Sequence, residues 1–218
     1  MQLLGCDMDG VLFRGRIFWL DLHTKMGTQA FALDLWERYG HSDYRRLSEL
    51  TAQRWKGRDA SVYHTMCKRR PVMPGTNELF AYARKKEFVT AIISSGPWHL
   101  ARRAQQKWGI DHIFANKLSF TKDGRFGGSV DVQVDDNSKD DVLKRLQSDL
   151  AIRPSETIVI GDSKADARMA DLSSCSIGYN VGDEQNERDL DFFAESHLGN
   201  VMPHVRGCVA KTKAYAAG

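Results

Sequence analysis

Short apolar runs alternate with helical segments along most of this chain of 218 residues. The clearest runs, Leu3–Cys6, Phe88–Ile93 and Thr157–Ile160, have the continuous apolar character of strands that are buried on both faces. From Pro74 onward, strands of this kind alternate with segments of helical periodicity. The alternation predicts parallel strands joined by right-handed crossovers, and therefore an α/β fold with a Rossmann-like parallel sheet.

One stretch interrupts the alternation, because residues 14–71 contain only segments of helical periodicity. The expected helices are Ile17–Met26, Thr28–Tyr39, Ser42–Lys56 and Ser61–Arg69, with Thr28 and Ser42 as caps. Since the first strand must join the same sheet as the later ones, we interpret this stretch as a helical cap inserted after that strand. The predicted domains are a Rossmann-like catalytic core of residues 1–13 and 72–218 and a cap of residues 14–71.

The later elements complete the expected core. Residues 118–134 are predicted to form a β-hairpin that turns at Asp123-Gly124. The remaining short strands are predicted at Ile113–Ala115, Ser176–Tyr179 and Phe192–Ala194. The remaining helices are predicted over residues 74–86, Pro97–Trp108, Lys139–Leu150, a segment that ends at Leu172, and Leu198–Val209.

Composition limits the class of protein. Apolar residues make up 42% of the chain and aromatic residues 10%, which is enough for a hydrophobic core and excludes a disordered chain. No apolar run approaches the length of a membrane span, and the amino terminus lacks the features of a signal peptide. The four cysteines show no paired spacing, which argues against a zinc or redox motif and favours reduced thiols in a cytoplasmic protein.

Two aspartates, Asp7 and Asp9, follow the first strand directly and precede Gly10. Side chains two residues apart on an extended chain point the same way, and the carboxyl ends of parallel strands are where open α/β sheets build their sites. One carboxylate can attack phosphorus as a nucleophile while its neighbour transfers a proton to the leaving oxygen. The motif alone also fits a simple Asp-Gly turn.

Three further motifs fall where the same architecture places chemistry. Ser94-Ser95-Gly96 ends one strand and opens a helix, so its hydroxyl and free amides could bind an anion, although a serine cap would use the same residue. Asp162 and Asp166 follow another strand, and three carboxylates in one crevice would need a cation such as Mg²⁺. Lys139 begins a helix and could neutralise phosphoryl oxygens, or could be an ordinary surface lysine.

Taken together, these motifs resemble the haloacid dehalogenase superfamily from Leu3 to about Val205, and most closely its phosphoserine phosphatase-like members. Residues 91–96, 113–118 and 136–143 carry the closer similarity. The resemblance implies that Asp7 is the nucleophile, which forms an aspartyl-phosphate, and that Asp9 is the general acid and base. It also implies that Ser94, Lys139 and the Ser95 and Gly96 amides surround the phosphoryl group. The implied metal ligands for Mg²⁺ are Asp7, Asp9 through its carbonyl, Asp162, and Asp166 directly or through water.

Two positions depart from the phosphoserine phosphatase pattern. Arg16 stands where those enzymes have a glutamate that holds the serine amino group, and Ala165 stands where their last motif has asparagine. A guanidinium repels an ammonium, so we expect phosphoserine not to be the best substrate and Arg16 to contact the substrate. Residues 14–70 carry 12 basic and 6 acidic residues, a balance of +6, which favours a more anionic metabolite.

The sequence therefore predicts a Mg²⁺-dependent phosphomonoester hydrolase that acts on a small phosphorylated metabolite through an aspartyl-phosphate. A phosphomutase of the same superfamily is one alternative, and a nucleic-acid-binding module built on the basic cap is another. No aromatic stacking platform is recognisable, so we expect neither nucleic acid nor membrane as a partner. A monomer or homodimer is expected.

Overall fold

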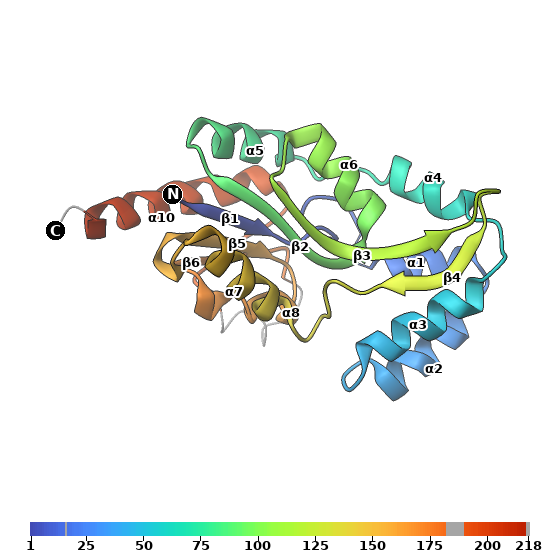
Figure 1. Cartoon of the computed structure of the whole chain (residues 1–218). Coiled ribbons are helices and arrows are strands. Elements are labelled where there is room, and N and C mark those ends of the chain that lie inside the picture. Colours follow the sequence, from blue (N-terminus) through green and yellow to red (C-terminus); the bar gives the residue numbers. More distant parts are fainter. Residues whose placement is uncertain (16, 182–189, 217–218) are drawn as a thin grey trace.

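The computed structural model describes residues 1–15, 17–181 and 190–216 (Figure 1). The described strands form a seven-stranded sheet in the order β4-β3-β2-β1-β5-β6-β7. All neighbouring strands are parallel except β3 and β4, which form the predicted hairpin. The strands are β1 (Leu3–Cys6), β2 (Val89–Pro97), β3 (His112–Phe120), β4 (Phe126–Asp131), β5 (Thr157–Gly161), β6 (Cys175–Tyr179) and β7 (Phe192–Ala194). The α/β fold with a mainly parallel sheet is confirmed.

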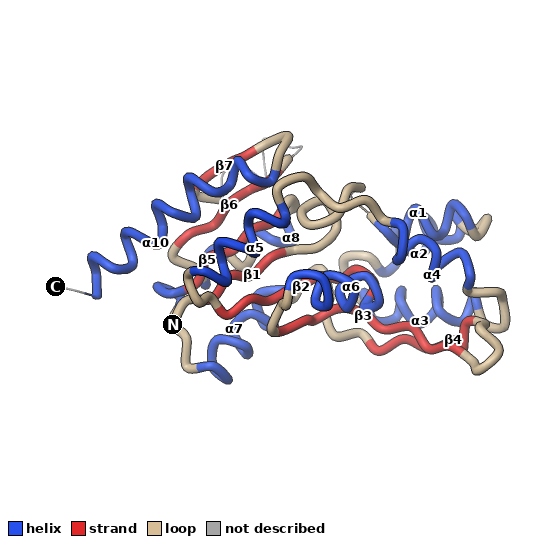
Figure 2. The backbone as a smooth tube through the Cα atoms, turned by 90° about the horizontal axis from the view of Figure 1, so that it is seen from above, coloured by secondary structure: helices blue, strands red, loops and turns tan. Residues whose placement is uncertain are grey.

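Helices cover both faces of this sheet. On one face, Leu4 and Cys6 of β1 belong to an apolar core shared with α5, α6 and α10, which lie over the sheet in Figure 2. On the other face, Leu3 belongs to a second core shared with α7. Successive β1 side chains thus point to opposite faces, as the pleat requires. The core helices are α5 (Thr76–Lys85), α6 (Trp98–Trp108), α7 (Lys139–Leu150), α8 (Lys164–Ala167) and α10 (Met202–Ala216).

Four helices occupy the chain between β1 and β2 ahead of α5, as the predicted insert requires. They are α1 (Phe18–Lys25), α2 (Gln29–Tyr39), α3 (Tyr44–Trp55) and α4 (Ser61–Arg69). Figures 1 and 2 both show these helices beyond the carboxyl ends of β1 and β2, beside the β3–β4 hairpin. None of the helices in the described part of the chain is long and apolar enough to cross a membrane.

Some helix boundaries differ from the sequence prediction. Helix α3 is capped by Asp43, whose side chain accepts a hydrogen bond from the Arg46 amide at 2.9 Å, so Ser42 is not the cap. Thr28 does precede α2, but its hydroxyl bonds other side chains and does not cap the backbone. The helix expected to run to Leu172 is broken into the short α8 and a 3₁₀ turn over Ala170–Leu172.

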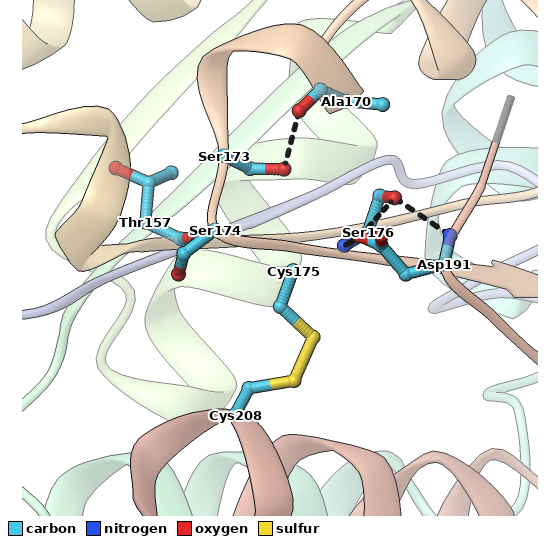
Figure 3. Close-up of a disulfide and its surroundings, with 8 residues drawn as sticks. All are labelled: Thr157, Ala170, Ser173, Ser174, Cys175, Ser176, Asp191 and Cys208. Carbon is cyan, nitrogen blue, oxygen red and sulfur yellow. Dashed lines mark hydrogen bonds between the residues drawn. A yellow bond between two sulfur atoms is a disulfide. The ribbon is translucent and has the colours of Figure 1, made fainter. Parts of the chain in front are cut away.

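The cysteine prediction is wrong for two of the four residues. Cys175 of β6 and Cys208 of α10 form a disulfide that ties the helix to the sheet (Figure 3). The pair is 33 residues apart in sequence, so only the packing of the last helix on β6 brings the two sulfur atoms together. Cys6 and Cys67 are free and buried, as expected of reduced thiols.

Reduction of this disulfide is expected to destabilise the fold. A cross-link that closes a loop of this length lowers the entropy of the unfolded chain and typically stabilises a protein by about 2–4 kcal/mol. Urea unfolding with and without dithiothreitol should show a loss of this size in the wild type. The double variant Cys175→Ala/Cys208→Ala should be insensitive to dithiothreitol, whereas Cys67→Ala should keep the wild-type response. Equal curves for the wild type in both conditions would contradict a stabilising cross-link.

Candidate active site

Strand register explains why distant residues meet at one edge of the sheet. Cys6 lies opposite Ile92 of β2 and Ile160 of β5. The residues that follow these three positions therefore leave the sheet side by side. The Asp7 amide extends the pairing by donating a hydrogen bond to the Ile160 carbonyl at 2.9 Å. The catalytic motifs predicted from the sequence are brought together at this edge.

After Asp7 the chain folds back in a tight loop that contains Asp9. The Leu12 and Phe13 amides both donate to the Met8 carbonyl, at 2.9 and 3.1 Å. Within this loop the Asp9 carboxylate accepts a hydrogen bond from the Phe18 amide at 3.2 Å. Asp7 and Asp9 are both buried, but Asp9 faces the beginning of α1.

Arg70, at the end of α4, is a second neighbour of Asp9. Its guanidinium lies 3.9 Å from Asp9 Oδ1 and pairs on its other side with Asp21 of α1. Arg70 is 9% exposed, and its Nη2 has no hydrogen-bond partner among the described residues. Nothing in the sequence marks Arg70 as a site residue, because it ends a run of basic residues that a solvated helix end also explains.

Lys139 lies at the centre of a buried charge cluster. Its Nζ is 3.1 Å from Asp7 Oδ1 and 2.7 Å from Asp166 Oδ1. The other oxygen of Asp166 accepts hydrogen bonds from the Asp162 and Ser163 amides and from the Ser163 hydroxyl, at 2.7–3.1 Å. Burial acts against the charge of Lys139, but Asp166 and Asp7 raise its pKa well above the ordinary value. Lys139 is therefore a buried cation and not a surface lysine.

Three carboxylates form a group that fits a divalent cation. Oxygen atoms of Asp7, Asp162 and Asp166 all lie within 4.8 Å of one another. Asp7 Oδ1 is buried and faces the Lys139 ammonium at 3.1 Å, but it accepts no hydrogen bond from a described residue, so it can also coordinate a cation. Gly10, at φ +78°, allows the Asp162 carboxylate to come close to the loop after β1, because a Cβ on residue 10 would lie 2.0 Å from Asp162 Oδ2. Oxygen ligands in this number and spacing suit Mg²⁺.

Residues Ser94–Gly96, at the carboxyl end of β2, line the same site as the carboxylates. The Ser94 hydroxyl accepts a hydrogen bond from the Gly96 amide at 3.2 Å and hydrogen-bonds Asp7. The Ser95 carbonyl accepts from the Trp19 indole at 2.9 Å and from the Asn116 amide group at 3.0 Å. Trp19 thus links the loop to α1, and Asn116 links it to β3. Neither of these two positioning residues was identified as a site residue from the sequence.

Burial raises the pKa of both aspartates. It raises the pKa of Asp7 to about 6 and is partly offset there by Lys139. Burial and the Asp7 charge raise the pKa of Asp9 to about 7, although Arg70 acts in the opposite direction. A carboxyl group with a pKa near neutral can both give and accept a proton.

A cavity of about 690 Å³ lies at this edge of the sheet. Asp7, Asp9, Ser94, Lys139 and Asp162 line it at the sheet edge, together with Ser95 and Gly96. Asp166 lies behind this surface, where it holds Lys139. Arg16, the predicted substrate contact, falls outside the described residues.

Comparison with known proteins gives the class to which this site belongs. The family model of the haloacid dehalogenase-like hydrolases matches residues 4–171. The chain therefore belongs to this family, as the motifs predicted. A curated relative, named phosphoserine phosphatase, from Wolinella succinogenes is 23% identical over 207 residues, which cover 94% of this chain and all of that protein. Another relative of that name, from Campylobacter jejuni, is 34% identical over 112 residues, covering 50% of this chain and 53% of that protein.

Solved structures agree in fold. A phospho-aspartyl intermediate analogue of phosphoserine phosphatase superposes with a TM-score of 0.78 at 19% identity, over 93% of this chain and 98% of that one. A substrate-bound phosphoserine phosphatase complex gives the same TM-score and identity, over 93% and 97%. The chain is thus similar to phosphoserine phosphatases over almost its entire length.

A buried histidine contributes to the far wall of the cavity. His23 Nδ1 lies 2.8 Å from the Thr28 hydroxyl, which also accepts a hydrogen bond from the Trp55 indole at 3.2 Å. The hydroxyl can donate to Nδ1 of a neutral imidazole or to the His23 carbonyl 3.4 Å away. Burial lowers the pKa of His23 from 6.5 to about 4, although Thr28 acts in the opposite direction.

Folding stability should therefore fall as the pH falls from about 6.5 towards 4. The unfolded chain binds the His23 proton at a higher pH than the folded chain does, so the stability from a neutral His23 is present above that range and lost within it. Urea unfolding should show that the wild type loses about 1–2 kcal/mol more than His23→Gln between pH 7.5 and pH 5. His64→Gln, which removes an exposed histidine, should behave as the wild type does. Parallel losses in His23→Gln and wild type would contradict this role.

Proposed function

We propose that the protein is a Mg²⁺-dependent phosphomonoester hydrolase that acts on a small phosphorylated metabolite through an aspartyl-phosphate on Asp7. The observation that carries the proposal is the buried Lys139 ammonium between Asp7 and Asp166, with an acid of pKa about 7 two residues from Asp7. Family membership and the similarity to phosphoserine phosphatases support the same reaction class.

The first step would transfer the phosphoryl group to the protein. The Asp7 carboxylate attacks phosphorus, and the bond from phosphorus to the ester oxygen breaks. Lys139, the Ser94 hydroxyl and nearby amides stabilise the charge on the phosphoryl oxygens. Asp9 gives its proton to the leaving oxygen, and the alcohol departs.

The second step would return Asp7 to its starting state. Asp9, now ionised, accepts a proton from a water that attacks the phosphorus of the aspartyl-phosphate. The bond from Asp7 to phosphorus breaks, and inorganic phosphate is released. Arg70 would act as a positioning residue, because its charge near Asp9 favours the ionised form that this step needs.

Mg²⁺ would be held by the Asp7 and Asp162 carboxylates and, as the sequence predicts, by the Asp9 carbonyl. Both oxygens of Asp166 already have partners, which supports binding of Asp166 through water. The cation would supply neutralisation of the phosphoryl charge and keep three carboxylates together.

Residues 14–71 would form the cap domain over this site. The proposal is supported by the contacts of Phe18 with Asp9 and of Trp19 with Ser95, which join α1 to the reacting edge of the sheet. The role of Arg16 in substrate choice remains a prediction from the sequence alone.

Substitution of the two aspartates tests the mechanism. Asp7→Asn should abolish hydrolysis of a simple phosphomonoester and the trapping of an acid-stable phosphoenzyme, because an amide cannot form the acyl-phosphate. Asp9→Asn should slow turnover by roughly 10²–10⁴-fold, the usual contribution of a general acid and base. Wild-type turnover without added sugar bisphosphate would distinguish a phosphatase from a phosphomutase. Equal and modest losses in both variants would refute the assigned roles.

Metal dependence gives a separate test. Turnover should require a divalent ion and should be supported by Mg²⁺ but poorly by Ca²⁺, because Ca²⁺ takes more ligands at longer distances and would misplace the phosphoryl group. The measurement is the initial rate after treatment with chelator, followed by addition of each ion. Asp162→Asn should raise the Mg²⁺ concentration needed for half-maximal rate, whereas Asp171→Asn, outside the cluster, should not. Full activity in excess chelator would rule out the metal assignment.

A further inference from the structure

The cavity extends well beyond the reacting groups and changes character as it does so. From the sheet edge it continues between α1, α2 and α3, the helices shown beside the β3–β4 hairpin in Figure 1. Large apolar side chains line this part, which we call the apolar wall. The apolar wall consists of Ile17, Leu20, Leu33, Trp36, Leu47 and Trp55.

The wall carries no formal charge in the part of the insert that the structure describes. None of the described residues of 14–71 that line the cavity is lysine, arginine, aspartate or glutamate. The charged side chains in the described part of the insert therefore lie away from the cavity lining. The expectation of an anionic metabolite assumed that the charges of the insert lie on its inner surface. The described part of that surface carries none.

Exposed apolar side chains gather at this cavity. Ile17, Leu33 and Trp36 are 55%, 58% and 42% exposed, and they are three of only five large apolar side chains so exposed among the described residues. All three line the cavity. Apolar surface gathered around a cleft marks a site that a ligand covers, since scattered single residues would be normal.

One polar side chain beside the apolar wall has no hydrogen-bond partner among the described residues. Thr51 of α3 is 8% exposed, lines the cavity, and has a buried Oγ1 with no hydrogen bond among the described residues. Buried hydroxyl groups are almost always hydrogen-bonded, so this one is available to a ligand.

We propose that the apolar wall is the subsite for the leaving group, and that the substrate is a phosphomonoester of a large, uncharged, preferably aromatic alcohol that can hydrogen-bond Thr51. The inference rests on the proposed function, because the phosphoryl group would sit at Asp7 and the alcohol would extend along the wall. A cavity of this size suits a ligand much larger than serine. The ammonium and carboxylate of phosphoserine would meet no opposite charge on the apolar wall, which makes their desolvation there unfavourable. Besides the reacting groups, the described charged residues that line the cavity are Asp136, Lys164 and Arg168, and all three belong to the core.

The test compares esters of similar intrinsic reactivity. Values of kcat/KM are measured with Mg²⁺ for ethyl, 2-phenylethyl and 2-(2-naphthyl)ethyl phosphate, and for phosphoserine and phosphoglycerate. We expect the naphthyl ester to exceed ethyl phosphate and phosphoserine by roughly 10²-fold, because the added apolar surface is buried. A preference for phosphoserine or phosphoglycerate, or equal values along the ester series, would overturn the inference while leaving the phosphatase intact. Failure to hydrolyse any ester would instead overturn the proposed function.

Variants connect the preference to the wall. Trp36→Ala and Leu33→Asp should each reduce the ratio of kcat/KM for naphthylethyl to ethyl phosphate by about tenfold. Both residues are largely exposed, so the variants should fold. Phe193→Ala is the matched control, because Phe193 is 40% exposed but does not line the cavity, and it should keep the wild-type ratio. An unaltered ratio in both wall variants would also overturn the inference.

Discussion

The ammonium of Lys139 lies between two buried carboxylates, 3.1 Å from Asp7 and 2.7 Å from Asp166. Taking three charges out of water is unfavourable, and the arrangement is stable only because each charge faces an opposite one. Removal of Lys139 would leave two buried carboxylates without their cation, and an uncompensated buried charge typically costs about 3–5 kcal/mol. The cluster joins the end of β1 and helix α8 to the start of α7, so the contact that holds these elements together also favours the charged form of Asp7, the proposed nucleophile.

Asp9 connects this rigid cluster to the helical insert. Its backbone leaves β1, but its carboxylate is held by the Phe18 amide and lies near Arg70, at opposite ends of the insert's chain. The ionisation of Asp9 is therefore sensitive to the position of the insert, since burial and Arg70 act on it in opposite directions. The Trp19 indole, which donates to the Ser95 carbonyl, also joins the insert to the carboxyl end of β2. The insert is thus part of the electrostatics of the site and not only a cover over it.

The predictions from sequence succeeded where a local rule determines position. Asp7, Ser94 and Asp162 all follow buried parallel strands, and strand ends must meet at one edge, so their convergence could be predicted without knowing the rest of the packing. Arg70, Asn116 and the Cys175–Cys208 disulfide could not be predicted in this way, because each depends on a contact between elements far apart in the chain. Nothing near Asn116 in the sequence shows that its oxygen accepts the Gln133 and Val134 amides while its nitrogen supports Ser95. The prediction of the α3 cap failed for a related reason. Ser42 and Asp43 are both good capping residues, and the residue at which the helix begins decides between them.

The net charge of the insert does not show where its charged side chains lie. Several basic side chains of the insert stabilise the insert itself: Arg58 donates to the Met26 carbonyl at 2.7 Å, and Arg38 pairs with Asp34 on the surface of α2. Another, Arg45, reaches across to the Val132 carbonyl at the end of the hairpin. A count of charges cannot distinguish these roles from a charged inner surface, because a helix carries polar residues on the face turned away from what it packs against. The amphipathic pattern that predicted four helices therefore also implied an apolar inner face. That face, and not the sum of charges, is what a leaving group would meet.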